Sequence, residues 1–329
     1  MANFDSSNLK KIAVYTSGGD APGMNAAIRS VVRTAITSGL EIEAIGQGYK
    51  GLLKGDFTPL NLRSVANIIQ RGGTVIKTGR SPEFHQPDQR KIAADQLRAR
   101  GIQALVCIGG DGSFTGAHTL WNEHQIPYVG IPGTIDNDIS GTDVTIGFDT
   151  AVNTALEAID RIRDTAASHD RLFIVEVMGR NSGFIAVDVG VAGGAEAVFI
   201  PESPLPVETA VDKIQAGMKA GKTSSILVAA EGQKPGRAYD LAEAIRKKSG
   251  YEAKVCILGH IQRGGAPTAA DRILGSRMGV YAVELLHRGV CDVMVGIRCG
   301  QILDVEMSSC LGKTKPLPPG VMDLVDRLR

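Results

Sequence analysis

The chain has 329 residues, a hydrophobic content of 43%, a charged content of 22% and a formal net charge of +1. These values are ordinary for a globular protein, and a chain of this length can form two domains. The balance of charges excludes a nucleic-acid or membrane-surface partner recruited through bulk charge. No apolar run has the length of a transmembrane span, and the start MANFDSSNLKK lacks the apolar stretch of a signal peptide. We therefore expect a cytoplasmic protein.

Apolar runs alternate with helical patterns along the chain, in this order. Buried strands are predicted at Lys11–Thr16, Glu41–Ile45, Ala104–Ile108, Ile126–Ile131, Arg171–Val177, Ser225–Ala230 and Val255–Leu258. Helical spacing is present at Ala26–Ile36, Asp88–Arg100 and Thr150–Asp164. Short apolar strands separated by helices indicate an α/β fold with mainly parallel sheets. Because no linker interrupts the pattern, a division into two domains requires a chain that crosses between them more than once.

The five cysteines show neither CxxC spacing nor an even number. This pattern argues against a disulfide framework and against a zinc site. We expect reduced and mostly buried thiols. The polar, glycine-rich motifs are more informative, because nearly all of them directly follow a predicted strand, where α/β folds bind their ligands.

The first motif is TSGGDAPGMN at 16–25. It lacks the Lys-Ser or Lys-Thr pair of a Walker A loop and the G-x-G-x-x-G pattern of a dinucleotide site. It nevertheless places glycines between a strand and the start of a helix, which favours anion binding. A tight connection without a ligand is the alternative.

The second motif is LVCIGGDGSFTGA at 105–117, in which Asp111 stands inside a loop typical of phosphate binding. A carboxylate repels phosphate unless a divalent cation lies between them. Mg²⁺ prefers one or two carboxylates together with phosphate oxygens and water. Asp111 is therefore a candidate magnesium ligand, while Gly110, Gly112 and Ser113 let a polyphosphate approach the backbone. Alternatively, Asp111 caps a helix that begins near Ser113.

The third motif is PGTIDNDISGTD at 132–143, where Asp136 and Asp138 flank Asn137 after a strand. One carboxylate could accept a hydroxyl proton while the other positions the reacting groups or the metal. An Asx-rich turn explains the same residues. Further strand ends carry Arg180 in EVMGRNSG and His260 with Arg263 in LGHIQRGG. Singly these signals are modest, but together they indicate phosphoryl transfer.

In this order, the segments 16–29, 109–113, 133–138, 176–180 and 258–265 closely resemble those of 6-phosphofructokinases of the bacterial, ATP-dependent type. The resemblance extends from about Lys10 to about Val295. It implies two Rossmann-like three-layer domains with the active site in the cleft between them. The larger, ATP-binding domain would comprise 1–147 with about 260–310. The smaller, fructose 6-phosphate-binding domain would comprise 148–259 with about 311–329.

The resemblance also implies roles for residues. Asp136 would accept the proton of the sugar 1-hydroxyl, Thr134 and Asp138 would support the phosphoryl group and magnesium, and Arg80 and Arg180 would stabilise transition-state charge. Residues that would line the nucleotide are Gly19, Tyr49, Arg80, Ser81, Gly110, Asp111, Gly112 and Ser113, with Asp111 serving Mg²⁺. The sugar phosphate would contact Thr134, Asp136, Arg171, Met178, Gly179, Arg180, Glu231, Lys254, His260 and Arg263. The activity implied is the committed step of glycolysis, performed by a homotetramer in which Arg171 and position 254 are shared across a subunit interface.

The donor and the regulation depend on departures from the family pattern. Pyrophosphate-dependent relatives carry Asp where this chain has Gly112 and Lys where it has Gly133, so the two glycines favour ATP. Lys254 replaces the usual arginine, which keeps the charge but loses the bidentate fork. Candidate effector residues are Arg29, Arg33, Arg163, Glu196 and Lys222. Leu62 and Ala220, however, stand where basic residues usually reach the effector, so we expect weak control by ADP or phosphoenolpyruvate.

Three other functions stay open at this point. The same fold could use pyrophosphate or another sugar phosphate such as tagatose 6-phosphate, or the chain could be a catalytically silent regulatory paralogue. The presence of Asp111, Thr134, Asp136 and Arg180 argues against a silent paralogue. The missing G-x-G-x-x-G pattern argues against a dinucleotide oxidoreductase.

Overall fold

The computed structural model describes residues 2–167, 172–232 and 235–328. The chain divides into two compact units. Unit 1 contains Met1–Thr134, Ile139–Asp149 and Arg263–Lys315, and unit 2 contains Ile135–Asp138, Thr150–Gln262 and Pro316–Arg329. Each unit is therefore assembled from separate stretches of the sequence.

Unit 1 is built on a 7-stranded sheet with the order β13-β12-β6-β5-β2-β3-β4. Its strands are β2 (Lys11–Ser17), β3 (Glu41–Ile45), β4 (Phe57–Pro59), β5 (Ala104–Gly109), β6 (Tyr128–Pro132), β12 (Val293–Arg298) and β13 (Gln301–Glu306). The five central strands run parallel, and β4 and β13 pair antiparallel at the two edges. Strands β2 and β5 are almost wholly buried, as expected for a parallel sheet covered on both faces.

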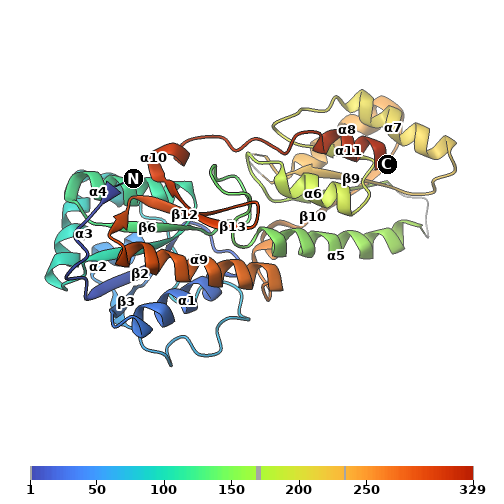
Figure 1. Ribbon diagram of the computed structural model, residues 1–329. Helices are drawn as coiled ribbons and strands as arrows, with labels where there is room; N and C mark the ends of the chain where they lie inside the picture. Colours follow the sequence, from blue (N-terminus) through green and yellow to red (C-terminus); the bar gives the residue numbers. More distant parts are fainter. Residues whose placement is uncertain (1, 168–171, 233–234, 329) are drawn as a thin grey trace. The chain divides into compact units, whose positions relative to one another are not determined.

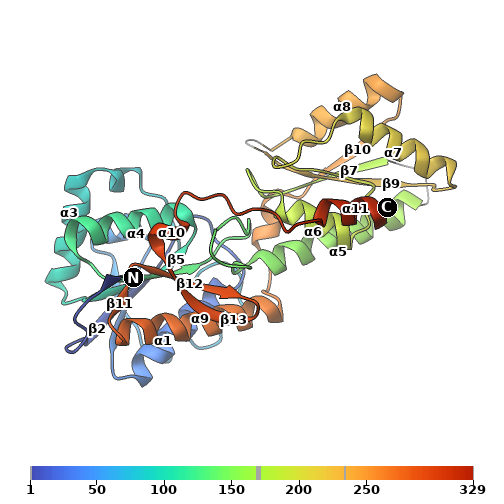
Figure 2. The ribbon, with the colours of Figure 1, turned by 45° about the horizontal axis from the view of Figure 1, so that its top comes forward.

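Helices cover both faces of this sheet (Figures 1 and 2). On one face α1 (Met24–Thr37) and α9 (Ala269–His287) lie side by side, and on the other face lie α3 (Pro87–Ala99) and α4 (Asp111–His124). The two helices pack closely at Gly279, which has no side chain, since a Cβ atom at this position would lie only 2.7 Å from the Ser30 Cβ. Smaller elements of unit 1 are β1 (Ala2–Asn3), α2 (Tyr49–Lys54), η1 (Pro82–His85), β11 (Val290–Cys291) and α10 (Met307–Cys310). The short helix η2 (Gly259–Arg263) belongs to unit 2 except for its last residue.

Unit 2 contains a 4-stranded parallel sheet with the order β10-β7-β9-β8. The strands are β7 (Leu172–Val177), β8 (Ala197–Phe199), β9 (Ser225–Ala230) and β10 (Ala253–Ile257). Figure 2 shows α7 (Val207–Lys219) and α8 (Arg237–Ser249) over one face, and α5 (Phe148–Ala167), α6 (Phe184–Ala192) and α11 (Val321–Leu328) over the other. One core cluster of this unit includes the buried side chains of Ile174, Phe199, Ile214, Leu227 and Ile245.

The predicted fold class is confirmed, since both sheets are mainly parallel and lie between layers of helices. Element boundaries differ at some ends. Helix α3 begins at Pro87, one residue before the predicted start at Asp88, and its N-cap is Gln86. The reason is that proline is favoured at the first helical position, where no backbone N–H is needed. Gly39, by contrast, follows α1 at a φ of 80°, the left-handed conformation typical of that position.

The cysteines of the structure are free thiols, and Cys107, Cys291 and Cys310 are buried. Among the described residues, no helix is both long enough and apolar enough to cross a membrane.

Candidate active site

Two glycine-rich loops of unit 1 meet at the point where the order of the strands reverses. Strands β2 and β5 are parallel neighbours, and the following strands β3 and β6 lie on opposite sides of this pair. In open α/β sheets ligands bind at such a switch point. The loops touch there, because a Cβ atom at Gly18 would lie 3.4 Å from the Ser113 hydroxyl oxygen. The motifs at 16–25 and 109–113 therefore form one surface.

Asp111 is the first residue of helix α4. The N-cap is Gly110, no side chain caps the helix, and so the alternative of Asp111 capping a helix near Ser113 is wrong. The exposed Asp111 carboxylate accepts a hydrogen bond from the Gly312 backbone N–H at 3.2 Å. A negative charge in the first turn of a helix is stabilised by the helix dipole, so the start of α4 is a favourable place for this carboxylate.

The two glycines that bear on the phosphoryl donor lie in different surroundings. A Cβ atom at Gly112 would meet nothing within 4 Å, as at Gly110, so a side chain there would extend into the space before the loop. At Gly133 a Cβ atom would lie 2.9 Å from the Met24 Cε and 3.1 Å from the Ile108 Cγ2. Packing inside unit 1 therefore accounts for Gly133, and the argument about the donor depends on Gly112.

The surroundings of Asp111 fit magnesium bound together with a polyphosphate. The site offers one exposed carboxylate next to open backbone, which matches the preference of Mg²⁺ for few carboxylates plus phosphate oxygens and water. In the part of the chain that the structure describes, no three His, Cys, Asp or Glu side chains form a cluster that could hold a metal.

Tyr49 supports the 109–113 loop from inside the protein. Its side chain is buried, and its hydroxyl donates to the Ser113 carbonyl oxygen at 2.5 Å and accepts from the Tyr15 hydroxyl at 2.9 Å. The ring stacks on Phe84 with the centroids 4.0 Å apart. Burial raises the pKa of Tyr49 well above its ordinary value, so the hydroxyl remains a proton donor. Sequence reasoning had no means of finding the partner Tyr15, which lies inside a strand.

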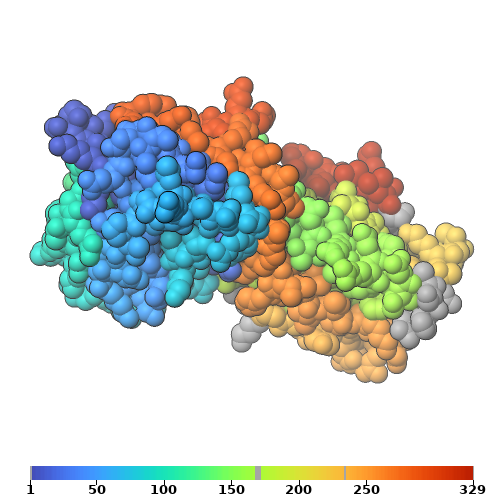
Figure 3. Space-filling model, turned by 90° about the horizontal axis from the view of Figure 1, so that it is seen from below, coloured from blue at the N-terminus to red at the C-terminus, as the bar shows by residue number. Residues whose placement is uncertain are grey.

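The segment 60–81, light blue on the surface of unit 1 in Figure 3, carries Arg80 and Ser81. Buried Asn25 holds this segment, donating through Nδ2 to the Arg71 carbonyl oxygen at 3.0 Å and accepting from the Val75 N–H at 2.8 Å. Arg80 is exposed, and the Ser81 hydroxyl donates to Glu83. Asn25 belongs to the first motif, but the motif alone does not reveal this role.

Two more predicted residues of unit 1 flank these loops. Arg263 lies against Gly19, since a Cβ atom there would come 2.0 Å from the Arg263 Nη1. Gly19 thus leaves room for this guanidinium group beside the first loop. Thr134 is the last residue of unit 1 before Ile135–Asp138, which belong to unit 2, and its carbonyl oxygen accepts from the Thr145 hydroxyl at 2.7 Å.

In unit 2 the carboxyl ends of adjacent parallel strands bring predicted sugar-site residues to one edge. Met178, Gly179 and Arg180 follow β7, Glu231 follows β9, and His260 follows β10. Asp136 and Asp138 also belong to unit 2. The Ser182 hydroxyl, which was assigned no role from sequence, donates to the Asp136 carbonyl oxygen at 2.8 Å and joins the turn of Asp136 to the Arg180 loop.

Some predicted residues lie elsewhere. Arg171 is outside the described residues. Lys254 is exposed on β10, which forms one edge of the sheet of unit 2. Among the effector candidates, Arg29 and Arg33 are on α1 of unit 1. In unit 2, Arg163 donates to the Gly193 and Gly194 carbonyl oxygens, and Lys222 pairs with buried Glu196 at 3.2 Å.

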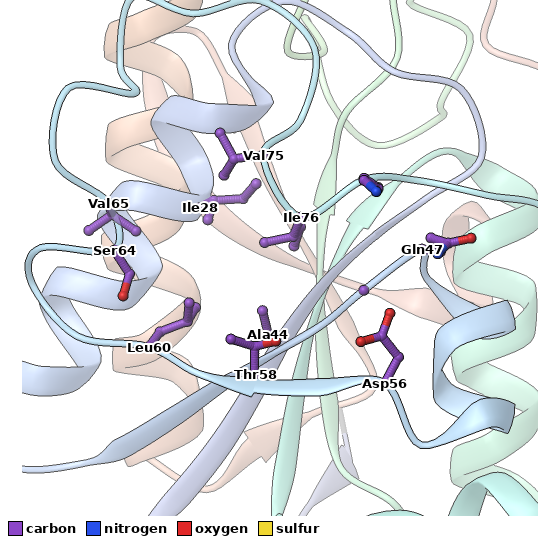
Figure 4. Close-up of a pocket in the computed structure, with 12 residues that line it drawn as sticks. Ile28, Ala44, Gln47, Asp56, Thr58, Leu60, Ser64, Val65, Val75 and Ile76 are labelled. Atoms are coloured by element: carbon purple, nitrogen blue, oxygen red, sulfur yellow. The ribbon is translucent and has the colours of Figure 1, made fainter.

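A cavity of ≈ 290 Å³ in unit 1 lies between β3, β4, α1 and the segment 60–77. Figure 4 shows apolar side chains such as Ile28, Leu60 and Val75 around it, with Gln47 and Asp56 towards one end. No predicted site residue lines this cavity.

Fold and loops together define a class: a two-unit α/β protein with phosphate-type glycine loops at the carboxyl ends of parallel strands. Within that class, the chain belongs to the phosphofructokinase family, whose sequence profile matches residues 11–286. This confirms the resemblance that the motifs indicated.

Individual relatives agree with this placement. ATP-dependent 6-phosphofructokinase 1 of Thermus thermophilus is 59% identical over 294 residues, 89% of this chain and 91% of the relative. The ATP-dependent 6-phosphofructokinase of Cytophaga hutchinsonii is 49% identical over 97% of this chain and 98% of its own. Among solved structures, phosphofructokinase from Saccharomyces cerevisiae superposes with a TM-score of 0.85 at 39% identity. That match covers 91% of this chain but 45% of the yeast chain, so this chain spans less than half of the yeast relative.

Proposed function

We propose that the protein transfers the γ-phosphoryl group of ATP to the 1-hydroxyl of fructose 6-phosphate, giving fructose 1,6-bisphosphate and ADP. The observation that carries the proposal is 59% identity over 91% of a relative named ATP-dependent 6-phosphofructokinase 1. The loops described above support it, because Asp111, Thr134, Asp136 and Arg180 all lie at the carboxyl ends of strands or directly after them.

In this proposal the two units have different tasks. Unit 1 binds the nucleotide through the loops at Gly19 and at 110–113, with Arg80 and Ser81 on the neighbouring segment. Unit 2 binds the sugar phosphate through Met178, Gly179, Arg180, Glu231 and His260, and Arg263 of unit 1 supplies a further cation. Lys254 and Arg171 complete the sugar site across a subunit interface of a homotetramer.

Asp136 acts as the general base. Its carboxylate accepts the proton of the 1-hydroxyl as that oxygen forms a bond to the γ-phosphorus and the bond from phosphorus to the ADP oxygen breaks. Arg180 and Arg80 stabilise the charge on the transferring group, and Thr134 and Asp138 position it. Mg²⁺, held through Asp111, neutralises charge on the phosphate oxygens when it is bound.

Regulation by ADP or phosphoenolpyruvate is proposed to be weak. Leu62 and Ala220 supply no charge for an effector phosphate, and Lys222 is paired with Glu196. A curve of velocity against fructose 6-phosphate that does not move with phosphoenolpyruvate would support this. The cytoplasmic location belongs to the same proposal, supported by the free thiols.

The test is formation of fructose 1,6-bisphosphate from fructose 6-phosphate and Mg²⁺, with ATP and pyrophosphate assayed in parallel. We expect turnover with ATP alone, whereas turnover with pyrophosphate would overturn the donor assignment. Asp136→Asn should lower kcat by orders of magnitude with little change in the KM for fructose 6-phosphate. A variant that kept its turnover would remove Asp136 from the role of base.

A further inference from the structure

The loop that carries Arg180 has an unfavourable backbone conformation. Gly179 has a φ of 139° and Arg180 a φ of 51°. Both values are positive, and residues other than glycine rarely adopt a positive φ. The loop closes on itself through the Ser182 N–H, which donates to the Gly179 carbonyl oxygen at 2.8 Å. Such conformations persist only where surrounding contacts hold them.

The turn that contains Asp136 has the same property. Asn137, directly after the proposed base, has a φ of 52° and is 4% exposed. The Ser182 hydroxyl, on a side chain that is also 4% exposed, donates to the Asp136 carbonyl oxygen at 2.8 Å. One hydroxyl thus connects two left-handed turns, one with the proposed base and one with the proposed transition-state arginine.

The Arg180 loop is anchored at its other end as well. The side chain of Gln262 is fully buried, accepts from the Met178 N–H at 2.8 Å, and donates to the Ala151 carbonyl oxygen at 3.2 Å. After the loop, the Gly183 N–H donates to Glu202 at 2.7 Å. With Met178 and Gly183 both fixed, the Ser182 side chain has little freedom, and its hydroxyl transmits the position of this loop to Asp136.

We infer that Ser182 is a positioning residue that fixes the main chain of Asp136 relative to the Arg180 loop. The inference rests on the proposed function, because Ser182 is assigned no contact with the substrate and acts only through the proposed base, Asp136. A misplacement of about 1 Å can cost about 100-fold in rate, so a single hydrogen bond at this place can matter to turnover more than to stability.

The first test compares Ser182→Ala with a matched variant, Ser30→Ala. Ser30 is 7% exposed on α1 of unit 1, and its hydroxyl donates to the Ser276 carbonyl oxygen at 2.6 Å. Each change removes one hydroxyl bond to a backbone carbonyl, so both should lower the melting temperature by similar amounts. We expect Ser182→Ala to reduce kcat about 10-fold, with the KM for ATP within about 2-fold, whereas Ser30→Ala keeps kcat within about 2-fold.

Two further measurements separate positioning from a merely structural role. Ser182→Thr, which retains the hydroxyl, should recover most of the kcat. In the Asp136→Asn background, measured by a radiolabelled phosphate assay, Ser182→Ala should have almost no additional effect, because the group that it positions is gone.

The outcomes distinguish the two levels of the argument. If the unmodified protein forms no fructose 1,6-bisphosphate, the proposed function fails. If it does, and Ser182→Ala turns over normally, or lowers kcat equally with and without Asp136, the inference about Ser182 is overturned. Should Ser182→Ala not fold, the pair Ser182→Thr and Ser182→Cys decides. Equal kcat values in these two would then contradict a role that depends on a strong hydroxyl donor.

Discussion

The buried pair Tyr15 and Tyr49 allows a sharp prediction, because the Tyr15 hydroxyl needs Tyr49 as its acceptor, whereas the Tyr49 hydroxyl has a separate acceptor. Tyr15 donates to Tyr49, and Tyr49 donates to the Ser113 carbonyl oxygen. In Tyr15→Phe the Tyr49 hydroxyl keeps its acceptor, and the cost is about 1 kcal/mol for one lost hydrogen bond. In Tyr49→Phe the Ser113 bond is lost and the Tyr15 hydroxyl, 1% exposed, loses its acceptor. That orphaned donor adds about 1–3 kcal/mol, so the total is about 2–4 kcal/mol.

Differential scanning calorimetry measures the difference. For units of this size 1 kcal/mol corresponds to about 2–4 °C in melting temperature, so Tyr49→Phe should melt clearly below Tyr15→Phe. In the double variant no hydroxyl is orphaned, and it should be no less stable than Tyr49→Phe alone. Tyr281→Phe, which removes a half-buried hydroxyl bonded to Asp304 at 2.8 Å, is the control for losing one bond. Equal costs for the two single variants, with additive effects in the double variant, would refute the reasoning.

Two other predictions concern the elements beside the loop at 109–113. Arg90 donates two hydrogen bonds of 2.6 Å to Glu123 and holds the pKa of that carboxyl below its ordinary value. The stabilisation is therefore present above the unfolded pKa of about 4.3 and is lost as the pH falls through the folded pKa. Glu123→Gln should cost about 1 kcal/mol at neutral pH and much less at about pH 3.5, and an equal loss of melting temperature at both would contradict the ion pair. Gly112→Asp should fold normally, since a Cβ atom there has open space, yet raise the KM for ATP about 10-fold or more through repulsion of phosphate. An unchanged KM would exclude Gly112 from the nucleotide site.

Much of the fold follows from local patterns. The bounds Glu41–Ile45 and Ser225–Ala230 are as predicted. Ser225–Ala230 shows the reason most clearly, because this buried parallel strand is a nearly continuous apolar run that ends at a polar residue. Other elements were not predicted, whether short or long. Strand β13 pairs with β12 at an edge of the sheet, and its partly exposed, mixed sequence QILDVE has no such run. Helix α9 has apolar residues around much of its circumference, so it lacks a single apolar stripe.

Sequence could suggest those candidate site residues whose type alone indicates a chemical role. It could not suggest residues whose role depends on contacts with residues distant in sequence. Asp111 stands out as an acid among glycines, and Asp136 as one of a pair. Nothing in the sequence connects Ser182 with Asp136, or Tyr15 with Tyr49 and Ser113, because these pairs are brought together only by the folded backbone. Gly133 illustrates the reverse case, since its requirement comes from the neighbouring side chains Met24 and Ile108.

The interleaving of the two units along the chain affects the order in which they can form during synthesis. All four strands of the sheet of unit 2 lie between Leu172 and Ile257. The sheet of unit 1 begins at Lys11 but requires β12, which inserts between β6 and β13 and starts only at Val293. A ribosome therefore releases every strand of unit 2 before it completes unit 1. Until β12 emerges, the edge of β6 that β12 later covers has no partner strand, and an unpaired strand edge is open to incorrect pairing with other chains.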